Sequence, residues 1–233
     1  MGTTEKIPII TIDGPVGSGK GSLSVMVARH LNYHLLDSGA LYRVLALAIN
    51  KRGIEVTDET KIHEVAVGLN IAFKEKIIGE PAAIILDDQD VTAEIRQESC
   101  GNLASVISSY STVRAALMGR QREFLKLPGL VADGRDMGTV VYPDAWVKFF
   151  LTASQEVRAN RRWRQLQDSQ SGVNLTSLLD EIKRRDDRDI NRVNSPLRPA
   201  PDAIIIDSSE MTINQVLTNM INIINKRLIE RAG

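Results

Sequence analysis

The stretch that most constrains the fold runs from Gly14 to Lys20, GPVGSGK, and fits the pattern G-x4-G-K. It follows a short β-branched apolar run at residues 8–12 and precedes residues 20–31, where apolar side chains recur at helical spacing. In that context a glycine-rich turn lets backbone N–H groups surround phosphate oxygens, and the helix N-terminus adds positive potential. We predict a phosphate-binding loop formed by Gly14, Pro15, Val16, Gly17, Ser18, Gly19, Lys20, Gly21 and Ser22.

Short apolar strands alternate with helical segments along much of the remaining chain. Further buried strands are predicted at residues 130–133, 147–151 and 203–207, and helices at 40–51, 92–108, 111–126, 154–167, 175–190 and 213–231. This alternation predicts a parallel sheet that is covered by helices on both faces. Residues 69–90 break the rhythm with two β-like runs, which predict a small antiparallel sheet within an insertion. We expect one α/β domain spanning residues 1–233.

The composition excludes several kinds of partner. Lys plus Arg (29) equals Asp plus Glu (29), so no overall field attracts the chain to nucleic acid or to an anionic membrane. The single cysteine, Cys100, rules out an internal disulfide. No stretch approaches the roughly 18 apolar residues of a membrane span, and the N-terminus lacks the regions of a signal peptide. We expect a cytoplasmic protein that binds neither nucleic acid nor membranes.

A phosphate loop by itself leaves the phosphate acceptor open. A GTP-dependent switch is disfavoured because the guanine-reading motif N-K-x-D is absent, and a motor or transporter ATPase normally needs a longer chain. A small-molecule phosphotransferase is therefore the leading class. Gly21 stands where the general motif carries a hydroxyl, which disfavours direct ligation of Mg²⁺ by a protein hydroxyl. We therefore name no residue of the chain as a ligand of the metal.

Two polar stretches follow the loop at places where packing alone does not require them. LLDSGALYR, residues 35–43, carries Ser38 and Arg43 at the start of a predicted helix; an N-cap serine and a surface arginine are the alternative reading. VADGRDMGTVV, residues 131–141, ends a buried strand in Arg135 and Asp136. Because ligands of open α/β sheets bind beyond the carboxyl ends of strands, this pair suits an anion and a hydrogen-bonding group. The alternative is a polar turn held by an Arg–Asp pair.

A third region is dense in arginine. VRANRRWR, residues 157–164, and IKRRDDRDINR, residues 182–192, lie on predicted helices that are joined by the polar residues 168–174. Helical spacing places Arg185, Arg188, Asp189 and Arg192 on one face. Such helices are often simply solvated. The other interpretation is a mobile lid, at about residues 157–192, whose cations close over a triphosphate and exclude water.

The motifs GPVGSGKG, LLDSGALYR, DGRDMGTVV and RRDDRDINR, in this order, resemble those of bacterial cytidylate kinases over nearly the whole chain. The resemblance implies a P-loop three-layer fold with a central parallel sheet and a short lid. It also implies an enlarged monophosphate-binding insert, at about residues 40–125, that contains the small antiparallel sheet. The implied activity is transfer of the γ-phosphoryl group of ATP, with Mg²⁺, to CMP or dCMP by a monomer.

The same resemblance assigns roles to individual residues. Catalysis falls to Lys20, Arg135 and Arg192, and ATP binding in the lid to Arg158, Arg162 and Arg188. The acceptor nucleotide would contact Ser38, Arg43, Ser105, Arg114, Arg135, Asp136, Arg185, Asp189 and Arg192. Within this set, Arg43 and Arg135 would hold the phosphate, Arg185 and Asp189 the ribose, and Ser105 and Arg114 the base.

Chemistry supports a cytosine site around Asp136. Cytosine presents an amino donor where uracil presents a carbonyl oxygen, so a carboxylate favours cytosine and repels uracil. Two alternatives stay open. The first is a related kinase that acts on UMP, AMP or a non-nucleotide acceptor. The second is a nucleotide-sensing module without transfer activity, which a turnover assay separates from a kinase.

Overall fold

The computed structural model describes residues 7–75, 77–167 and 174–232. Its centre is a five-stranded parallel sheet in the order β2-β6-β1-β7-β8. The strands are β1 (Ile9–Asp13), β2 (His34–Asp37), β6 (Leu130–Gly134), β7 (Val147–Thr152) and β8 (Ile204–Asp207). The register places Asp37 opposite Asp133 and Asp13 opposite Gly134. The carboxyl ends of β1, β2 and β6 therefore bring several acidic side chains to one edge of the sheet.

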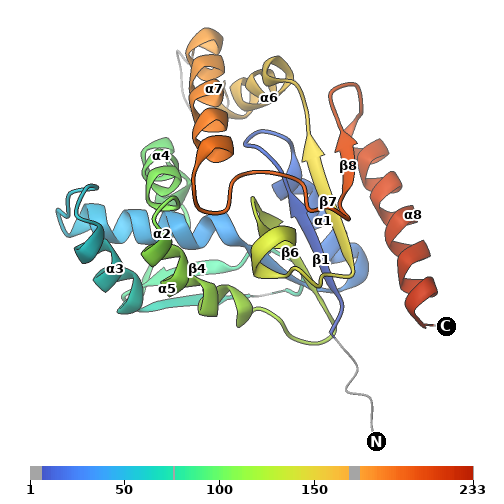
Figure 1. The fold of residues 1–233 in the computed structure, drawn as a ribbon, viewed down its shortest axis with the longest axis horizontal. Coiled ribbons are helices and arrows are strands. Elements are labelled where there is room, and N and C mark those ends of the chain that lie inside the picture. The colour runs from blue at the N-terminus through green and yellow to red at the C-terminus, as the bar shows by residue number, and fades with distance from the viewer. Residues whose placement is uncertain (1–6, 76, 168–173, 233) are drawn as a thin grey trace, which may run out of the picture.

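Helices cover both faces of this sheet and make three layers (Figure 1). Helices α1 (Lys20–Leu31) and α8 (Ile213–Ala232) pack together on one face, where their apolar side chains bury those of β1 and β7. The opposite face is covered by the start of α2 (Ser38–Lys51) and by a π-helical turn, η2 (Met137–Val141). Because both faces are covered, the strands are apolar almost throughout, as expected for a parallel sheet.

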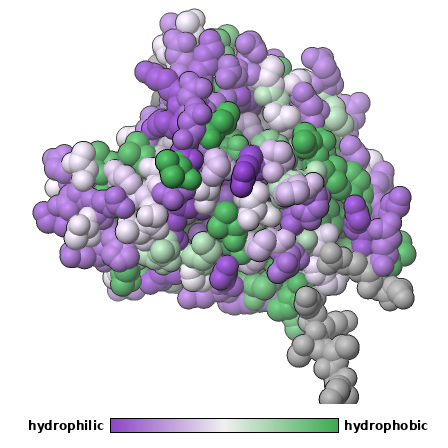
Figure 2. Space-filling view, viewed as in Figure 1, coloured by the Kyte–Doolittle hydropathy of each residue, from purple (hydrophilic) through white to green (hydrophobic). Residues whose placement is uncertain are grey.

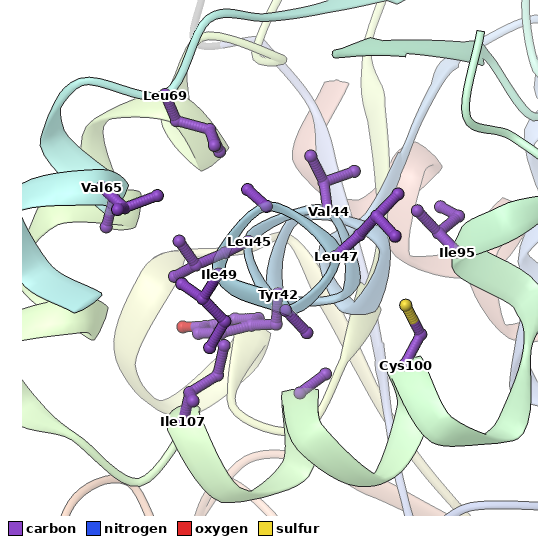
Figure 3. Packing of buried hydrophobic residues seen from close by; sticks show 14 of the residues in the cluster. Tyr42, Val44, Leu45, Leu47, Ile49, Val65, Leu69, Ile95, Cys100 and Ile107 are labelled. Atoms are coloured by element: carbon purple, nitrogen blue, oxygen red, sulfur yellow. The ribbon is translucent and has the colours of Figure 1, made fainter. Parts of the chain in front are cut away.

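The elements between α2 and β6, which we call the insert, pack around α2, and this helix is buried along most of its length. In Figure 3 the helix is seen end-on, with Val65 and Leu69 on one side and Ile95 and Cys100 on the other. The insert contains three helices, α3 (Glu59–Val67), α4 (Glu98–Ile107) and α5 (Ser111–Arg122), and a short 3-10 turn, η1 (Glu94–Arg96). Strands β3 (Ile71–Lys74), β4 (Ala83–Leu86) and β5 (Gln89–Asp90) form the expected antiparallel sheet, in that order.

Two helices, α6 (Gln155–Gln167) and α7 (Leu175–Asn191), stand above the carboxyl edge of the sheet in Figure 1. Hydrophilic side chains dominate the surface of α7 in Figure 2. The residues between the two helices, where we expect the tip of a lid, lie outside the described residues except for Asn174. The side chain of Asn174 caps α7 by accepting a hydrogen bond from the Thr176 amide at 2.8 Å.

The structure confirms the predicted fold class and corrects several local predictions. The edge strand β2 and helix α3 were not predicted. The predicted helix 92–108 is divided into η1 and α4, and α2 begins at Ser38 rather than at residue 40. None of the described helices is long and apolar enough to cross a membrane.

Candidate active site

The phosphate loop lies where the sequence predicts it, between β1 and α1. Gly14 has φ +153°, and a side chain there would collide with the carbonyl oxygen of Leu151 on the neighbouring strand. Gly19 has φ +92° immediately before α1 begins at Lys20. Only glycine adopts these conformations at low cost. The glycines therefore permit a tight loop whose amides and following helix N-terminus suit an anion.

Lys20 lies at the base of this loop and is only 9% exposed. Its Nζ donates a hydrogen bond to the carbonyl oxygen of Pro15 at 3.1 Å. Burial and the neighbouring charge of Arg135 lower the pKa of Lys20 to about 7, although Asp133 opposes the shift. Burial raises the pKa of Asp133 to about 7 against the opposing charge of Lys20. Near pH 7 each of these two groups is therefore about half charged.

Helix α6 contacts the phosphate loop through hydrogen bonds from two of its arginines, Arg158 and Arg161. Arg158 is 3% exposed, donates to the carbonyl oxygen of Val16 at 3.0 Å and forms a bidentate ion pair with Asp186 of α7. Arg161 donates to the carbonyl oxygen of Ser18 at 3.1 Å and to the hydroxyl of Ser208 at 3.0 Å. These bonds couple the position of the loop to α6 and, through Asp186, to α7.

Beside the loop, a pocket of about 210 Å³ opens between α2, α4, β6 and α7. We call it the arginine pocket, because five arginines line it with Lys20. Every residue predicted to contact the acceptor nucleotide is among its lining residues: Ser38, Arg43, Ser105, Arg114, Arg135, Asp136, Arg185, Asp189 and Arg192. These residues are up to 154 positions apart in the sequence, from Ser38 to Arg192, and the fold brings all of them together.

One end of the arginine pocket is organised by the ion pair between Arg114 and Asp136, which are 6% and 3% exposed. Arg114 also donates to the carbonyl oxygen of Ser108 at 3.3 Å, and its guanidinium lies 5.9 Å from the centre of the Tyr42 ring. The hydroxyl of Ser105 is buried without a hydrogen-bond partner among the described residues. This end combines a fixed carboxylate, a fixed guanidinium and a free hydroxyl.

The other end carries an excess of positive charge. Arg135 donates to Asp189 at 2.9 Å. Arg185 Nε is buried there and has no hydrogen-bond partner among the described residues. The same holds for Nη2 of Arg192, which lies between the two ends, because Arg192 and Arg114 both donate to Ser108. Burial, with the charge of Arg135, lowers the pKa of Arg185 to about 10. Burial alone would raise the pKa of Asp189, but the surrounding arginines lower it instead. Buried donors without partners are costly, so this end is built to receive an anion.

The π-helical turn η2, which directly follows Arg135 and Asp136, is held in place by Asp13, a residue that the sequence analysis did not single out. The two carboxylate oxygens of Asp13 accept hydrogen bonds from the amides of Met137 and Gly138, each at 2.8 Å. Burial raises the pKa of Asp13 to about 7, and the two amide bonds oppose that shift. Asp13 therefore holds the turn that presents Arg135 and Asp136.

Three predicted ATP-binding arginines do not share one site. Arg158 is buried in its ion pair with Asp186, and Arg162 pairs with Glu98 of the insert. Arg188 is exposed on α7 and lies outside the arginine pocket. Of the four residues expected on one helix face, Arg185, Asp189 and Arg192 line the arginine pocket. Arg192 reaches the pocket from the extended residue that follows α7 and not from the helix face.

A glycine-rich phosphate loop that faces a pocket of arginines defines a P-loop phosphotransferase. A family model described as cytidylate kinase matches residues 10–226. The chain belongs to the cytidylate kinase family.

Curated relatives agree with this assignment. The chain is 50% identical to a cytidylate kinase of Shewanella baltica over 97% of this chain and 98% of that protein. It is 52% identical to a cytidylate kinase of Pseudomonas fluorescens over 93% and 95%. A solved thymidylate kinase from Candida albicans aligns with a TM-score of 0.41 and 13% identity, covering 97% of this chain and 95% of that chain.

Proposed function

We propose that the chain transfers the γ-phosphoryl group of ATP to CMP or dCMP, giving ADP and CDP or dCDP. One observation carries the proposal beyond family membership. The arginine pocket joins unpartnered guanidinium nitrogens, on Arg185 and Arg192, to a fixed carboxylate, on Asp136, and opens on Lys20. An acceptor with a phosphate for Arg192, ribose hydroxyls for Arg185 and a cytosine amino group for Asp136 satisfies all three groups.

Cytosine would lie beside the Arg114–Asp136 pair. Asp136 would accept a hydrogen bond from the amino group of the base, and Arg114 would donate to its ring nitrogen or carbonyl oxygen. The free hydroxyl of Ser105 offers a further bond. Uracil would place a carbonyl oxygen against the carboxylate of Asp136. Such a site discriminates by on the order of 10⁴, because its buried polar groups stay unpaired with the wrong base.

The acceptor phosphate would lie among Arg43, Arg135 and Arg192, in line with the γ-phosphate on the loop. Arg185 and Asp189 would hold the ribose. The attacking atom is already a phosphate oxygen, so the reaction needs alignment and charge neutralisation rather than a strong general base. Lys20 would move from the carbonyl oxygen of Pro15 to the β- and γ-phosphates, where its charge is stabilised.

The adenosine of ATP would bind in a different pocket from the acceptor nucleotide. A pocket of about 310 Å³ adjoins the loop at Gly19 and Ser22 and is lined by Arg161 and Arg164 of α6. ATP would place its adenosine there. In this arrangement Arg158 acts by holding the loop and Arg161 lies nearest to the nucleotide. Arg162 and Arg188 would reach the phosphates only after the lid, at about residues 157–192, closes.

Mg²⁺ would accompany ATP, and one carboxylate of this chain suits it. Oδ1 of Asp133 is buried, has no hydrogen-bond partner among the described residues and lies at the loop beside Lys20. Carboxylate oxygens are the ligands that Mg²⁺ prefers. Asp133, with Asp37 opposite it across β2 and β6, would hold the ion directly or through water. Bound there, the ion would neutralise charge on the β- and γ-phosphates.

The fate of the phosphate tests this proposal. Enzyme with ATP labelled in the γ-phosphate and Mg²⁺ should transfer label to CMP and dCMP and yield labelled diphosphates, with little label released as inorganic phosphate. Lys20→Ala is the inactive control. Release of label only to water would indicate an ATPase. Binding of nucleotide without turnover of any acceptor would indicate a sensing module and would overturn the proposal.

A further inference from the structure

A groove separate from the arginine pocket lies beside the first turns of α2. It consists of two adjoining pockets, of about 310 Å³ and 200 Å³, between β2 of the central sheet and the small antiparallel sheet. The two pockets share Leu35, Phe73, Ala82 and Phe124, so they form one continuous groove. We call it the insert groove. None of these four shared residues lines the arginine pocket.

The floor of the insert groove suits a planar ring. Phe73 and Phe124 pack edge-to-face, with ring centres 4.9 Å apart and an interplanar angle of 72°. Leu35, Ile84 and Ile95 extend the apolar surface around the larger pocket. Flat aromatic ligands gain both apolar burial and ring contacts on such a surface.

The rim of the larger pocket is cationic. Arg43, Arg96 and Arg162 line it, and Asp37 is the one carboxylate among its lining residues. Arg96 is exposed, and its guanidinium has no hydrogen-bond or ion-pair partner among the described residues. Guanidinium groups recognise phosphate oxygens with strong, directional hydrogen bonds. A ligand that matches both the floor and the rim carries a planar ring and a phosphate.

The insert groove communicates with the arginine pocket through shared residues. Asp37 and Arg43 line both cavities. Arg43 donates to the carbonyl oxygens of Ile95 and Gln97, at 3.0 and 3.4 Å, so it is tethered to the turn that forms the wall of the groove. A phosphate in the groove would therefore draw on the same guanidinium that the acceptor phosphate needs.

We propose that the insert groove binds a nucleoside phosphate as an effector that weakens binding of the acceptor nucleotide. The ring stacks on the Phe73–Phe124 pair and the phosphates meet Arg96 and Arg43. Because coupling between two sites is reciprocal, bound acceptor also weakens binding of the effector. The kinetic consequence rests on the proposed kinase activity, whereas binding in the groove does not.

The kinetic test varies CMP at saturating ATP and Mg²⁺ with increasing UTP as the probe. The apparent KM for CMP should rise by about fivefold or more and then level off, because coupling between separate sites is finite. A KM that rises without limit would show that UTP simply occupies the acceptor site, and an unchanged KM would show no coupling; either result overturns the proposal. Uridine or tripolyphosphate alone should have little effect. An equal effect of tripolyphosphate would reveal an adventitious anion site only.

Two substitutions locate the effect. Ala82→Phe fills the groove and should abolish the response to UTP while the KM for CMP without UTP stays unchanged. Ala72→Phe adds the same ring to an exposed position of β3 and should respond like the wild type. Arg96→Gln should weaken the response without filling the groove. A full response in both Ala82→Phe and Arg96→Gln would overturn the proposal.

Direct binding separates failure of this proposal from failure of the kinase assignment. Fluorescently labelled UTP is titrated into each variant with excess ADP on the phosphate loop, and anisotropy is followed without turnover. Binding should be weakened by Ala82→Phe and not by Ala72→Phe. Equal binding by these two variants would contradict the proposed site whatever the catalytic activity.

Discussion

Replacing Arg192 with alanine should lower kcat much more than it changes the KM for CMP. Two nitrogens of its guanidinium are engaged, Nε with the carbonyl oxygen of Ser195 at 2.6 Å and Nη1 with the hydroxyl of Ser108 at 3.4 Å. The third, Nη2, is buried and unpartnered among the described residues. In the proposed role, a charge-assisted hydrogen bond from this nitrogen to the transferring phosphoryl group would contribute about 1.5–3 kcal/mol. Its loss corresponds to a decrease in kcat of roughly 10- to 150-fold.

Steady-state kinetics with CMP and ATP–Mg²⁺ measures this effect. Arg184→Ala removes an exposed arginine from α7, the helix that Arg192 directly follows, and should keep wild-type kinetics. A variant Arg192→Ala that raises the KM for CMP while kcat stays unchanged would refute the reasoning, because it would show that the residue stabilises bound substrate and transition state equally. Far-UV circular dichroism of both variants checks that the fold is intact.

Three further predictions concern the base, the loop and pH. Asp136→Asn should reduce the kcat/KM preference for CMP over UMP by about tenfold or more, since one charge-assisted bond to cytosine is lost; an unchanged ratio would remove the residue from base reading. Arg158→Met should cost about 3–5 kcal/mol in urea unfolding, because the buried carboxylate of Asp186 loses its partner; a loss below about 1 kcal/mol would contradict a structural role. The kcat/KM for ATP should be highest near pH 7: Lys20 loses its charge above its pKa of about 7, and Asp133 loses its charge below its pKa of about 7. A flat profile from about pH 6 to about pH 8 would contradict this assignment.

The main features of the fold are predictable because they depend on strong local patterns. The phosphate loop combines glycines, a buried strand and a helix start in one short stretch. Strands β6 and β7 are short and mostly apolar, LVADG and VKFFLT. Strand β2 was missed because only Leu35 and Leu36 of its four residues are buried. Two buried residues are too few to predict a strand, especially because α2 begins directly after β2. Helix α3 did carry a usable signal, the capping residue Asp58 before buried residues at helical spacing.

The residues of the site were predictable from the sequence, whereas the contacts that hold them in place were not. The residues of the arginine pocket stand in distinctive motifs, and the family resemblance related those motifs to a common ligand. The partnership of Arg158 with Asp186 joins two helices and leaves no local signal, so a solvated or nucleotide-binding arginine was the natural interpretation. The contact of Asp13 with the amides of Met137 and Gly138 spans more than 120 residues and depends on the strand register. Only the folded chain reveals such pairs.

The central claim is that the Arg114–Asp136 end of the arginine pocket selects cytosine in the acceptor nucleotide. The most direct test is the ratio of kcat/KM for CMP to kcat/KM for UMP, measured on the wild-type chain with saturating ATP and Mg²⁺. The structure predicts a ratio on the order of 10⁴, because uracil places a carbonyl oxygen, not an amino donor, against the buried carboxylate of Asp136. A ratio near one, or a preference for UMP, would show that the phosphate is transferred without reading the base through this pair.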